Sequence, residues 1–466
     1  MNQKKQLFKN TIIIAIGKLG TQIISFFLLS LYTSKLEPGE YGTYDFLTTL
    51  SALLIPIITL LMEESMFRFL IDAETEKEKR KVITATVLYT IFGITVFGIL
   101  AGIVMLILKY EYGLLFILLV ISTILIGLSN CLARGNGKIK LYSISNFILG
   151  ALTIILNIVF IVPLNMGVKG LLLSNVVANL FTAFLMFAKL KLKKYVRKKD
   201  ISRKTLREMI KYSIPLVPNN ISWIIIGVSD RLMLTWIAGS AANGIYSIAN
   251  KFPYVIYTCY GFFSTAWKES AARILKEENK KAYYNSIYKD IKVFLKAVIL
   301  GLIAIMPFAF GFFVDASYNE AYVYIPILAI SIYFTNMSNF YGGIFTAYKD
   351  TKIMGSTTLW SAVLNIVLNL IFIPKFGIYA AAFSTLLSNW IVYVYRRIKL
   401  KKYIKLKEKF NILYWLLLAG TIVAYYINNT IINVVVFIIV LVYCIYTNKD
   451  FLLGILKNFK RKDSST

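Results

Sequence analysis

The sequence of 466 residues contains no histidine, and this absence narrows the chemistry open to the chain. Histidine is the commonest general base, the commonest metal ligand and the usual proton switch near neutral pH. The three cysteines, Cys131, Cys259 and Cys444, fall in apolar surroundings without paired spacing. Such cysteines are typical of small core residues and not of disulfides or metal ligands. The sequence therefore predicts no metal site.

Motifs for nucleotide and sugar-transfer chemistry are also missing. No Gly-Lys-Ser/Thr phosphate-binding loop occurs, so we expect no ATP hydrolysis by this chain. Neither an Asp-x-Asp pair nor a large soluble loop is present to hold a nucleotide sugar, which argues against a membrane glycosyltransferase or polymerase. We therefore expect a protein that is not an enzyme and that carries no cofactor.

Charged residues are scarce and apolar residues are abundant. The chain is 16% charged and 58% hydrophobic, with a mean hydropathy of +0.67. Its apolar residues fall in blocks of about twenty, the length that crosses a bilayer as a helix. The net charge of +29 would indicate nucleic-acid binding in a soluble chain. Here Lys and Arg lie in short loops between the blocks, so we expect a polytopic, all-α membrane protein and no nucleic-acid partner.

About fourteen transmembrane helices are predicted, and the charges between them set the topology. The predicted spans are 11–32, 44–62, 82–108, 113–133, 141–163, 167–188, 213–237, 244–266, 291–314, 321–347, 353–373, 376–395, 411–427 and 431–447. The N-terminus MNQKKQLFKN is basic and leads directly into the first span, which we expect to be uncleaved. Loops predicted outside carry few cations, namely Lys35, Lys109, Lys169 and Lys375. The positive-inside rule therefore places both termini in the cytoplasm.

The chain also repeats itself. Glu40-Tyr41-Gly42-Thr43-Tyr44 aligns with Ala242-Asn243-Gly244-Ile245-Tyr246, and Leu156–Pro163 aligns with Leu368–Pro374. Six spans separate equivalent points, so both copies enter the membrane from the same side and the repeats are parallel. We predict an N-terminal six-helix lobe over 1–200, a C-terminal six-helix lobe over 201–400, and two additional helices with a basic tail over 401–466.

Cations lie inside several predicted spans, where they are costly unless they face protein or water. Lys18 and Gln22 share one face of the first span, and the repeat aligns Lys18 with Asn220. Lys251 lies in the eighth span and Arg231 near the outer end of the seventh. Two lobes that face each other would enclose a positive cavity suited to an anionic substrate, a diphosphate in particular. The alternative for Lys18 and Lys251 is snorkelling to the nearer interface.

Acidic residues at the span ends are candidates for gating or ion coupling. Asp230 and Arg231 are adjacent on a helix and point about 100° apart, so each needs a partner on another helix. Such partners could lock the lobes on the outside or could contact substrate directly. Glu64 and Glu269 are repeat equivalents at the cytoplasmic ends of their spans and are predicted to form gate or loop ion pairs, with contact to substrate as the alternative. Proton or sodium coupling would have to use Asp45, Asp230 or the glutamates.

Asparagines recur within the predicted spans. They are Asn146, Asn157, Asn175, Asn179, Asn336, Asn339, Asn365, Asn369 and Asn389. Hydrogen bonding between helices explains such residues. A wall that binds sugar hydroxyls is the alternative, and the 15% aromatic content fits both readings.

Several motifs resemble those of the polysaccharide and lipid-linked oligosaccharide flippases of the multidrug/oligosaccharidyl-lipid/polysaccharide exporter superfamily. They are Leu36-Glu37-Pro38-Gly39-Glu40-Tyr41-Gly42, Ser229-Asp230-Arg231, Asn243-Gly244-Ile245-Tyr246-Ser247 and Phe372-Ile373-Pro374-Lys375-Phe376-Gly377-Ile378. The resemblance implies alternating access between two lobes and transport of an undecaprenyl-diphosphate-linked oligosaccharide for surface polysaccharide biosynthesis. It also implies basic residues that grip the diphosphate, a role that Lys18, Lys251 and Arg231 could take, and a possible partnership with a polysaccharide polymerase and chain-length machinery.

A multidrug-type exporter of the same superfamily is the competing function. A site for cationic drugs should present buried carboxylates, whereas the charges placed within these spans are mostly basic.

Overall fold

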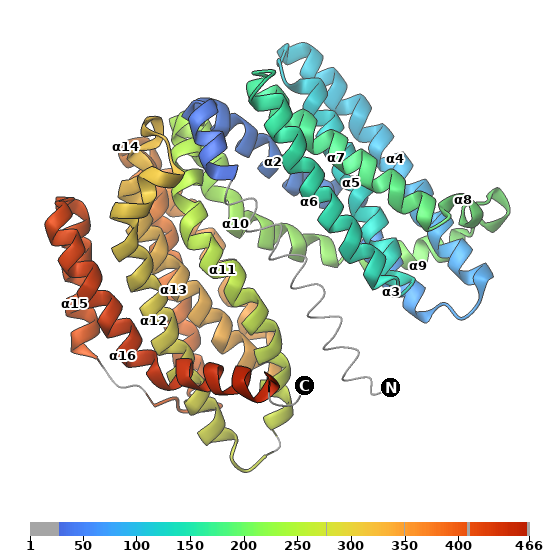
Figure 1. Cartoon of the computed structure of the whole chain (residues 1–466). Helices are drawn as coiled ribbons and strands as arrows, with labels where there is room; N and C mark the ends of the chain where they lie inside the picture. The colour runs from blue at the N-terminus through green and yellow to red at the C-terminus, as the bar shows by residue number, and fades with distance from the viewer. Residues whose placement is uncertain (1–27, 276, 349, 408–410, 464–466) are drawn as a thin grey trace. The chain divides into compact units, whose positions relative to one another are not determined.

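The computed structural model describes residues 28–275, 277–348, 350–407 and 411–463, and within them every regular element is a helix (Figure 1). Residues 28–35 are helical and lead into the first helix with described bounds. The helices are α2 (Pro38–Thr59), α3 (Met62–Asp72), α4 (Glu76–Leu108), α5 (Gly113–Gly135), α6 (Ile139–Ile161), α7 (Gly167–Lys189), α8 (Leu192–Tyr195), η1 (Lys198–Asp200), α9 (Arg203–Ser213), α10 (Leu216–Ala238), α11 (Ser240–Ile274), α12 (Lys280–Phe313), η2 (Ala316–Tyr318), α13 (Glu320–Ala347), α14 (Thr351–Leu400), α15 (Ile412–Ile427) and α16 (Thr430–Asp463).

These helices confirm the predicted all-α membrane architecture. Nine of the helices within the described residues are long and apolar enough to cross a bilayer, and α15 is a shorter apolar helix. Their apolar surfaces are turned outward: only 11% of the most apolar window of α4, and the same share of α16, is buried. Exposed apolar faces of this extent are expected where a helix contacts lipid. The total of fourteen spans stays a prediction.

Local sequence explains where several helices begin. Pro38 stands in the first turn of α2, where its missing N–H is not needed, and Glu37 and Glu40 form a reciprocal capping box there. Thr75 and Glu78 form the same motif at the start of α4. With these caps, α2 and α4 each begin six residues before the predicted spans that start at 44 and 82. Hydropathy places both starts too late, because the first turns of these helices are polar.

The chain divides into two compact units, and each is described by itself. Unit 1 comprises Met1–Thr235 and Gly239–Gly244, and unit 2 comprises Trp236–Ala238 and Ile245–Thr466. Helix α9 and α10 up to Thr235, which the sequence repeat assigns to the second lobe, thus belong to unit 1. The two units are defined by which residues pack together, whereas the predicted lobes are defined by the sequence repeat. The predicted lobe boundaries at 200 and 400 therefore stay predictions.

Unit 1 is built around α5 and α7, which share two apolar clusters along their length. One cluster joins their N-terminal halves to α2, with Leu47, Phe116 and Leu172 nearly inaccessible to solvent. The other joins their C-terminal halves to α3, α4 and α9, with Met62, Met186 and Met209 at its centre. In unit 2 the central helix is α13, which is buried over most of its length and packs on α14 and α12.

A similar hydrogen bond between two helices occurs inside each unit. In unit 1 the Asn179 side chain on α7 donates to the Ser122 hydroxyl on α5 at 3.3 Å. In unit 2 the Asn389 side chain on α14 donates to the Ser331 hydroxyl on α13 at 2.9 Å. The repeat that relates Gly167 to Gly377 also relates Asn179 to Asn389, and in each unit the hydrogen bond joins this asparagine to a serine on a neighbouring helix.

Gly167 and Gly377, which the sequence repeat also aligns, have nearly the same positive φ. Their φ angles are +53° and +54°, in the left-handed region that favours glycine. The range of α14 comprises two helices that meet at a kink at Gly377, the one residue within it with non-helical φ and ψ. The kink lies beside the predicted boundary between the spans 353–373 and 376–395, and the number of spans stays a prediction.

Candidate functional site

The first turns of α2 and α11 cross in contact within unit 1, and a pair of aligned glycines makes the crossing possible. A Cβ placed on Gly42 would lie 1.7 Å from the carbonyl oxygen of Ser240. A Cβ on Gly244 would lie 2.0 Å from the carbonyl oxygen of Pro38. The two approaches are reciprocal, as expected for equivalent elements related by an approximate two-fold axis. Neither position can carry a side chain without movement of the backbone.

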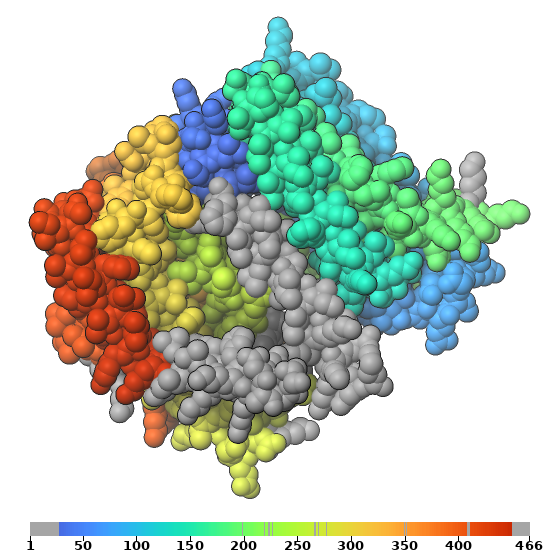
Figure 2. All heavy atoms as spheres, in the orientation of Figure 1, coloured from blue at the N-terminus to red at the C-terminus, as the bar shows by residue number. Residues whose placement is uncertain are grey.

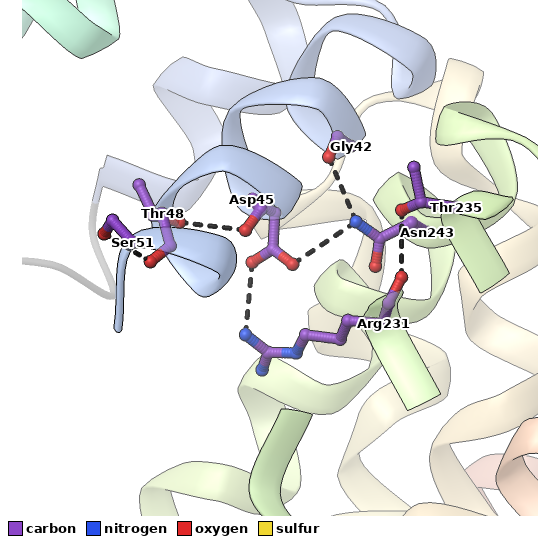
Figure 3. Close-up of polar contacts among 7 residues, drawn as sticks. All are labelled: Gly42, Asp45, Thr48, Ser51, Arg231, Thr235 and Asn243. Carbon is purple, nitrogen blue, oxygen red and sulfur yellow. Dashed lines mark hydrogen bonds and ion pairs between the residues drawn. The ribbon is translucent and has the colours of Figure 1, made fainter. Parts of the chain in front are cut away.

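A polar cluster lies beside this crossing (Figure 3). The Arg231 guanidinium on α10 forms an ion pair with the Asp45 carboxylate on α2, with Nη1 3.2 Å from Oδ1. The Asn243 side chain on α11 donates to the carbonyl of Gly42 at 3.0 Å and approaches Asp45 Oδ2 at 3.4 Å. One carboxylate therefore receives donors from two other helices, and all three residues belong to unit 1.

Burial makes this cluster energetically significant. The Asp45 side chain is 8% exposed and that of Arg231 is 22% exposed. Asn243 is fully buried. Removal of one member of a buried pair leaves an uncompensated charge, which costs far more than loss of an exposed pair. The cluster is therefore positioned to hold the ends of α2, α10 and α11 together.

The sequence anticipated part of this arrangement. It predicted that Arg231 needs a partner on another helix, and that partner is Asp45, itself proposed as a gate or coupling residue. Asn243 is not predicted as a site residue. In the sequence it appears only as a polar residue within the repeated motif that contains Gly244. The two roles assigned to Asp45 and Arg231, gating and substrate binding, stay predictions.

Other predicted site residues are distributed over both units. Lys18 and Gln22 lie outside the described residues. Asn220 is half-buried on α10, and Asp230 is buried next to Arg231. Lys251 is half-buried on the part of α11 that belongs to unit 2. The proposed cavity between the lobes, which would need these residues together, therefore stays a prediction.

One of the predicted cytoplasmic gate residues, Glu64, follows a break between two helices. Leu60 and Leu61 both adopt left-handed backbone conformations and separate α2 from α3. Glu64 lies in the first turn of α3 with its side chain exposed, and the Cys131 thiol approaches its Oε1 at 3.8 Å. Glu269 lies on α11, and its side chain is outside what the structure describes. Pro56 is inside α2, and the break falls just beyond it.

Sequence reasoning missed a buried arginine in unit 2. Arg396 on α14 is 2% exposed, and its guanidinium donates to the Thr357 and Thr358 hydroxyls, each at 2.9 Å. It also donates to the carbonyls of Ser338 and Met354. Arg396 directly follows the predicted span 376–395, where the positive-inside rule already accounts for a cation. Its contacts bind the two ends of α14 to α13 through neutral oxygens.

The clefts described in unit 2 are apolar. One, of about 420 Å³, follows α14 past the Gly377 kink and is lined by residues such as Phe372 and Phe383. Another, of about 340 Å³, lies between α13 and α14 and includes Phe334 and Trp390. Their linings carry no charged side chain, so these clefts suit hydrocarbon and not a diphosphate.

Comparison with protein families identifies the chain's relatives. Residues 7–268 match the family model described as "Polysaccharide biosynthesis protein". The chain belongs to this family. Residues 215–371 also match the model described as MatE. The sequence-based resemblance to the multidrug/oligosaccharidyl-lipid/polysaccharide exporter superfamily is thereby confirmed.

Individual relatives are distant. An uncharacterized membrane protein of Methanocaldococcus jannaschii, MJ1375, is 25% identical over 302 residues, which cover 62% of this chain and 71% of that protein. The probable multidrug resistance protein YpnP of Bacillus subtilis is 26% identical over 203 residues, which cover 41% of this chain and 44% of that protein.

Solved structures show the fold. A structure of the lipid II flippase MurJ in an inward closed conformation covers 95% of this chain and 100% of its own, with a TM-score of 0.69 at 17% identity. An inward-facing multidrug resistance MATE transporter covers 83% of this chain and 98% of its own, with a TM-score of 0.66 at 14% identity. The family member thus has the fold of these multi-pass transporters.

Proposed function

We propose that the protein flips an undecaprenyl-diphosphate-linked oligosaccharide from the inner to the outer leaflet of a bacterial cytoplasmic membrane. The transport is by alternating access and serves surface polysaccharide biosynthesis. Membership of the polysaccharide biosynthesis family supports the substrate class, and the MurJ-like fold supports the mode of transport. A polysaccharide polymerase and its chain-length machinery are the partners that would consume the flipped product.

The observation that carries this proposal is the cluster of Asp45, Arg231 and Asn243 at the Gly42–Gly244 crossing. The predicted topology places the start of α2 and the start of α11 on the outer side of the membrane. There the ion pair and the Asn243 hydrogen bond join helix ends from both sequence repeats. Alternating access requires a contact of this kind, which forms on one side of the membrane while substrate enters from the other. We assign these residues to the outer gate.

The cations proposed for the diphosphate are Lys18, Lys251 and Arg231, with Gln22 and Asn220 offering polar groups on equivalent faces. A diphosphate gains charge-assisted hydrogen bonds from such residues. Arg231 is engaged by Asp45 when the gate is closed, so an opened gate would release its guanidinium for substrate. Gating and substrate binding would then use the same residue in turn.

A complementation assay tests the function. In a strain that lacks the protein, lipid-linked oligosaccharide should accumulate on the inner leaflet and surface polysaccharide should be lost. Variants Lys18→Ala, Lys251→Ala and Arg231→Ala should each fail to restore display at normal membrane expression, whereas Lys109→Ala in a predicted outer loop should restore it. Normal display in the deletion strain would contradict the proposal.

Export of small molecules is the second candidate, because the MatE model matches residues 215–371 and YpnP is a relative. It predicts that deletion sensitises cells to cationic drugs and leaves surface polysaccharide intact. The same deletion strain therefore decides between the two functions.

A further inference from the structure

The two apolar clefts described in unit 2 adjoin each other along the second half of α14. The side chains of Phe383 and Leu387 line both of them. The first cleft is also lined by Phe372, which precedes the kink at Gly377, so both halves of α14 contribute to it. The second cleft lies between this part of α14 and α13. We call the surface that the two clefts form together the α14 groove.

The α14 groove is open at the surface of unit 2. Phe383, Leu387 and Trp390 follow one another at helical spacing on one face of α14, and they are 54%, 41% and 45% exposed. The two additional helices, α15 and α16, pack against a different helix, α12. Figure 2 shows α15 and α16 at the surface of the molecule, in orange to red. The groove is therefore accessible to a hydrocarbon chain from the bilayer.

The depth of the α14 groove decides which chain fits it. Phe376 lines its outer part and opens the predicted span 376–395, while Trp390 lines its inner part. At the helical rise of 1.5 Å per residue, Trp390 lies about 21 Å deeper than Phe376. The hydrocarbon core of a bilayer is about 30 Å thick, so the groove passes the midplane. The acyl chain of a phospholipid ends near the midplane, whereas a polyprenyl chain is several times longer and can follow the whole groove.

A cation stands at the outer end of the α14 groove. The ammonium of Lys375 lies 5.6 Å from the ring centre of Phe376, and the Lys375 side chain is exposed. The predicted topology places Lys375 on the outer side of the membrane, where loops are poor in cations. The positive-inside rule therefore does not account for this lysine. A cation at the mouth of an apolar groove complements a lipid that carries phosphate on a long hydrocarbon chain.

We propose that the α14 groove binds the polyprenyl chain of the lipid-linked oligosaccharide, with the phosphate of this lipid beside Lys375 at the outer side. The inference rests on the proposed function and adds a place for the hydrocarbon part of the substrate. Phe376, Phe383 and Trp390 offer large apolar surfaces to a methyl-branched chain. Because the groove is open, the chain stays within the bilayer, and only the polar part of the substrate needs a path enclosed by protein.

Photocrosslinking of the full-length protein in detergent tests the groove, with undecaprenyl phosphate as the probe. The photoreactive residue p-benzoylphenylalanine replaces Phe383 in one variant and Trp390 in another. We expect both variants to crosslink to the probe and to keep doing so in an excess of phosphatidylglycerol. The same replacement at Ile99 on α4, which is 59% exposed, is the matched control and should give little crosslinking. Equal crosslinking at Ile99, or displacement of the probe by an equal amount of phosphatidylglycerol, would identify an ordinary lipid contact and overturn the proposal.

Native mass spectrometry measures the affinity for the same probe. Phe383→Ala with Leu387→Ala removes apolar contact area from both clefts and should weaken the binding of undecaprenyl phosphate by about 10-fold. Ile99→Ala with Ile103→Ala truncates side chains that are 59% and 52% exposed on α4 and should leave binding unchanged. Lys375→Gln should weaken the binding of undecaprenyl phosphate by about 3-fold and should not affect undecaprenol, which lacks the phosphate. Equal losses in the two double variants would contradict a specific groove.

Complementation separates this proposal from the proposed function. The double variant Phe383→Ala with Leu387→Ala should restore less surface polysaccharide than the unaltered protein at equal membrane expression. Full display by a protein that does not crosslink at Phe383 would overturn the groove and leave the flippase function standing. Normal display in the deletion strain, with crosslinking at Phe383 retained, would overturn the flippase function and not the binding of a polyprenyl chain.

Discussion

Gly42 and Gly244 occupy equivalent positions in the two sequence repeats and lie at one crossing of α2 with α11. At each glycine the backbone of the other helix lies so close that a Cβ atom would overlap one of its carbonyl oxygens. The sequence predicted their equivalence, since both stand in the same short motif. It did not predict their contact, because an internal alignment says which residues correspond and not which residues touch.

Gly42→Ala should therefore disrupt the crossing. The new Cβ would meet the Ser240 carbonyl oxygen at 1.7 Å, so the backbone has to shift, at a cost of roughly 1–3 kcal/mol. The shift should also separate Asp45 from Arg231. Thermal unfolding of the purified protein measures the loss.

Gly39→Ala is the matched control, since its Cβ would meet only the Ser240 hydroxyl at 3.7 Å. It lies in the same turn of α2 and should change stability by less than about 0.5 kcal/mol. Equal melting temperatures for the two variants would show that the close approach is not maintained in solution.

Asp45 and Arg231 should behave as a coupled pair. Asp45→Asn and Arg231→Gln each leave one buried or half-buried charge with a weaker partner, and each should destabilise by about 1–3 kcal/mol. The double variant should lose less than the sum of the two, with a coupling energy of about 1–2 kcal/mol. A double-mutant cycle on thermal unfolding measures this term.

The exposed pair of Lys169 with Glu111 provides the contrast. Its ions lie 2.8 Å apart but are 49% and 62% exposed, so Lys169→Gln should leave the melting temperature nearly unchanged. For the pair of Asp45 with Arg231, exchange of the charges by Asp45→Arg and Arg231→Asp together should recover more transport than either single change. Strict additivity of Asp45→Asn and Arg231→Gln in the double-mutant cycle would contradict the pairing.

Hydropathy predicted most helices closely, because an apolar run of the right length leaves little choice within a membrane. The predicted span 321–347 corresponds to α13, Glu320–Ala347, and the predicted span 113–133 to α5, Gly113–Gly135. Polar extensions were missed: α12 begins at Lys280 and not at 291, since charged helical turns outside the bilayer lower hydropathy without ending the helix.

The candidate site was less predictable. That Arg231 needs a partner follows from the cost of a lone charge, but the choice of Asp45 depends on how separate helices are placed. Lys296 and Arg396 were missed because both stand near span ends, where the positive-inside rule already accounts for cations. Their burial becomes visible only with the helices that cover them.

The equivalent asparagines test the repeat energetically. Asn179→Ala and Asn389→Ala each remove an interhelical hydrogen bond to a serine, at 3.3 Å and 2.9 Å. Each should cost roughly 0.5–1.5 kcal/mol, and the costs should add, since the sites belong to different units. Thermal unfolding of both single variants and of the double variant measures this. A strongly unequal or non-additive result would argue against equivalent roles.

Gly377→Ala tests the kink in α14 through the backbone alone. Gly377 adopts φ +54° and ψ −128°, a region essentially restricted to glycine, while an added Cβ would meet nothing within 4 Å. Any loss of stability therefore reports conformational strain, and we expect about 1–3 kcal/mol by thermal unfolding.

Gly355→Ala separates this strain from a general effect of alanine. Gly355 lies in the same helix, its added Cβ also meets nothing within 4 Å, and its φ is not positive. Alanine is favoured over glycine within a regular helix by up to about 1 kcal/mol, so this variant should be as stable as the original or more so. The two substitutions are chemically identical and should act in opposite directions, because only at Gly377 does the chain need a conformation that a side chain forbids. If both variants stabilise the protein, α14 is continuous through residue 377 and the kink is absent.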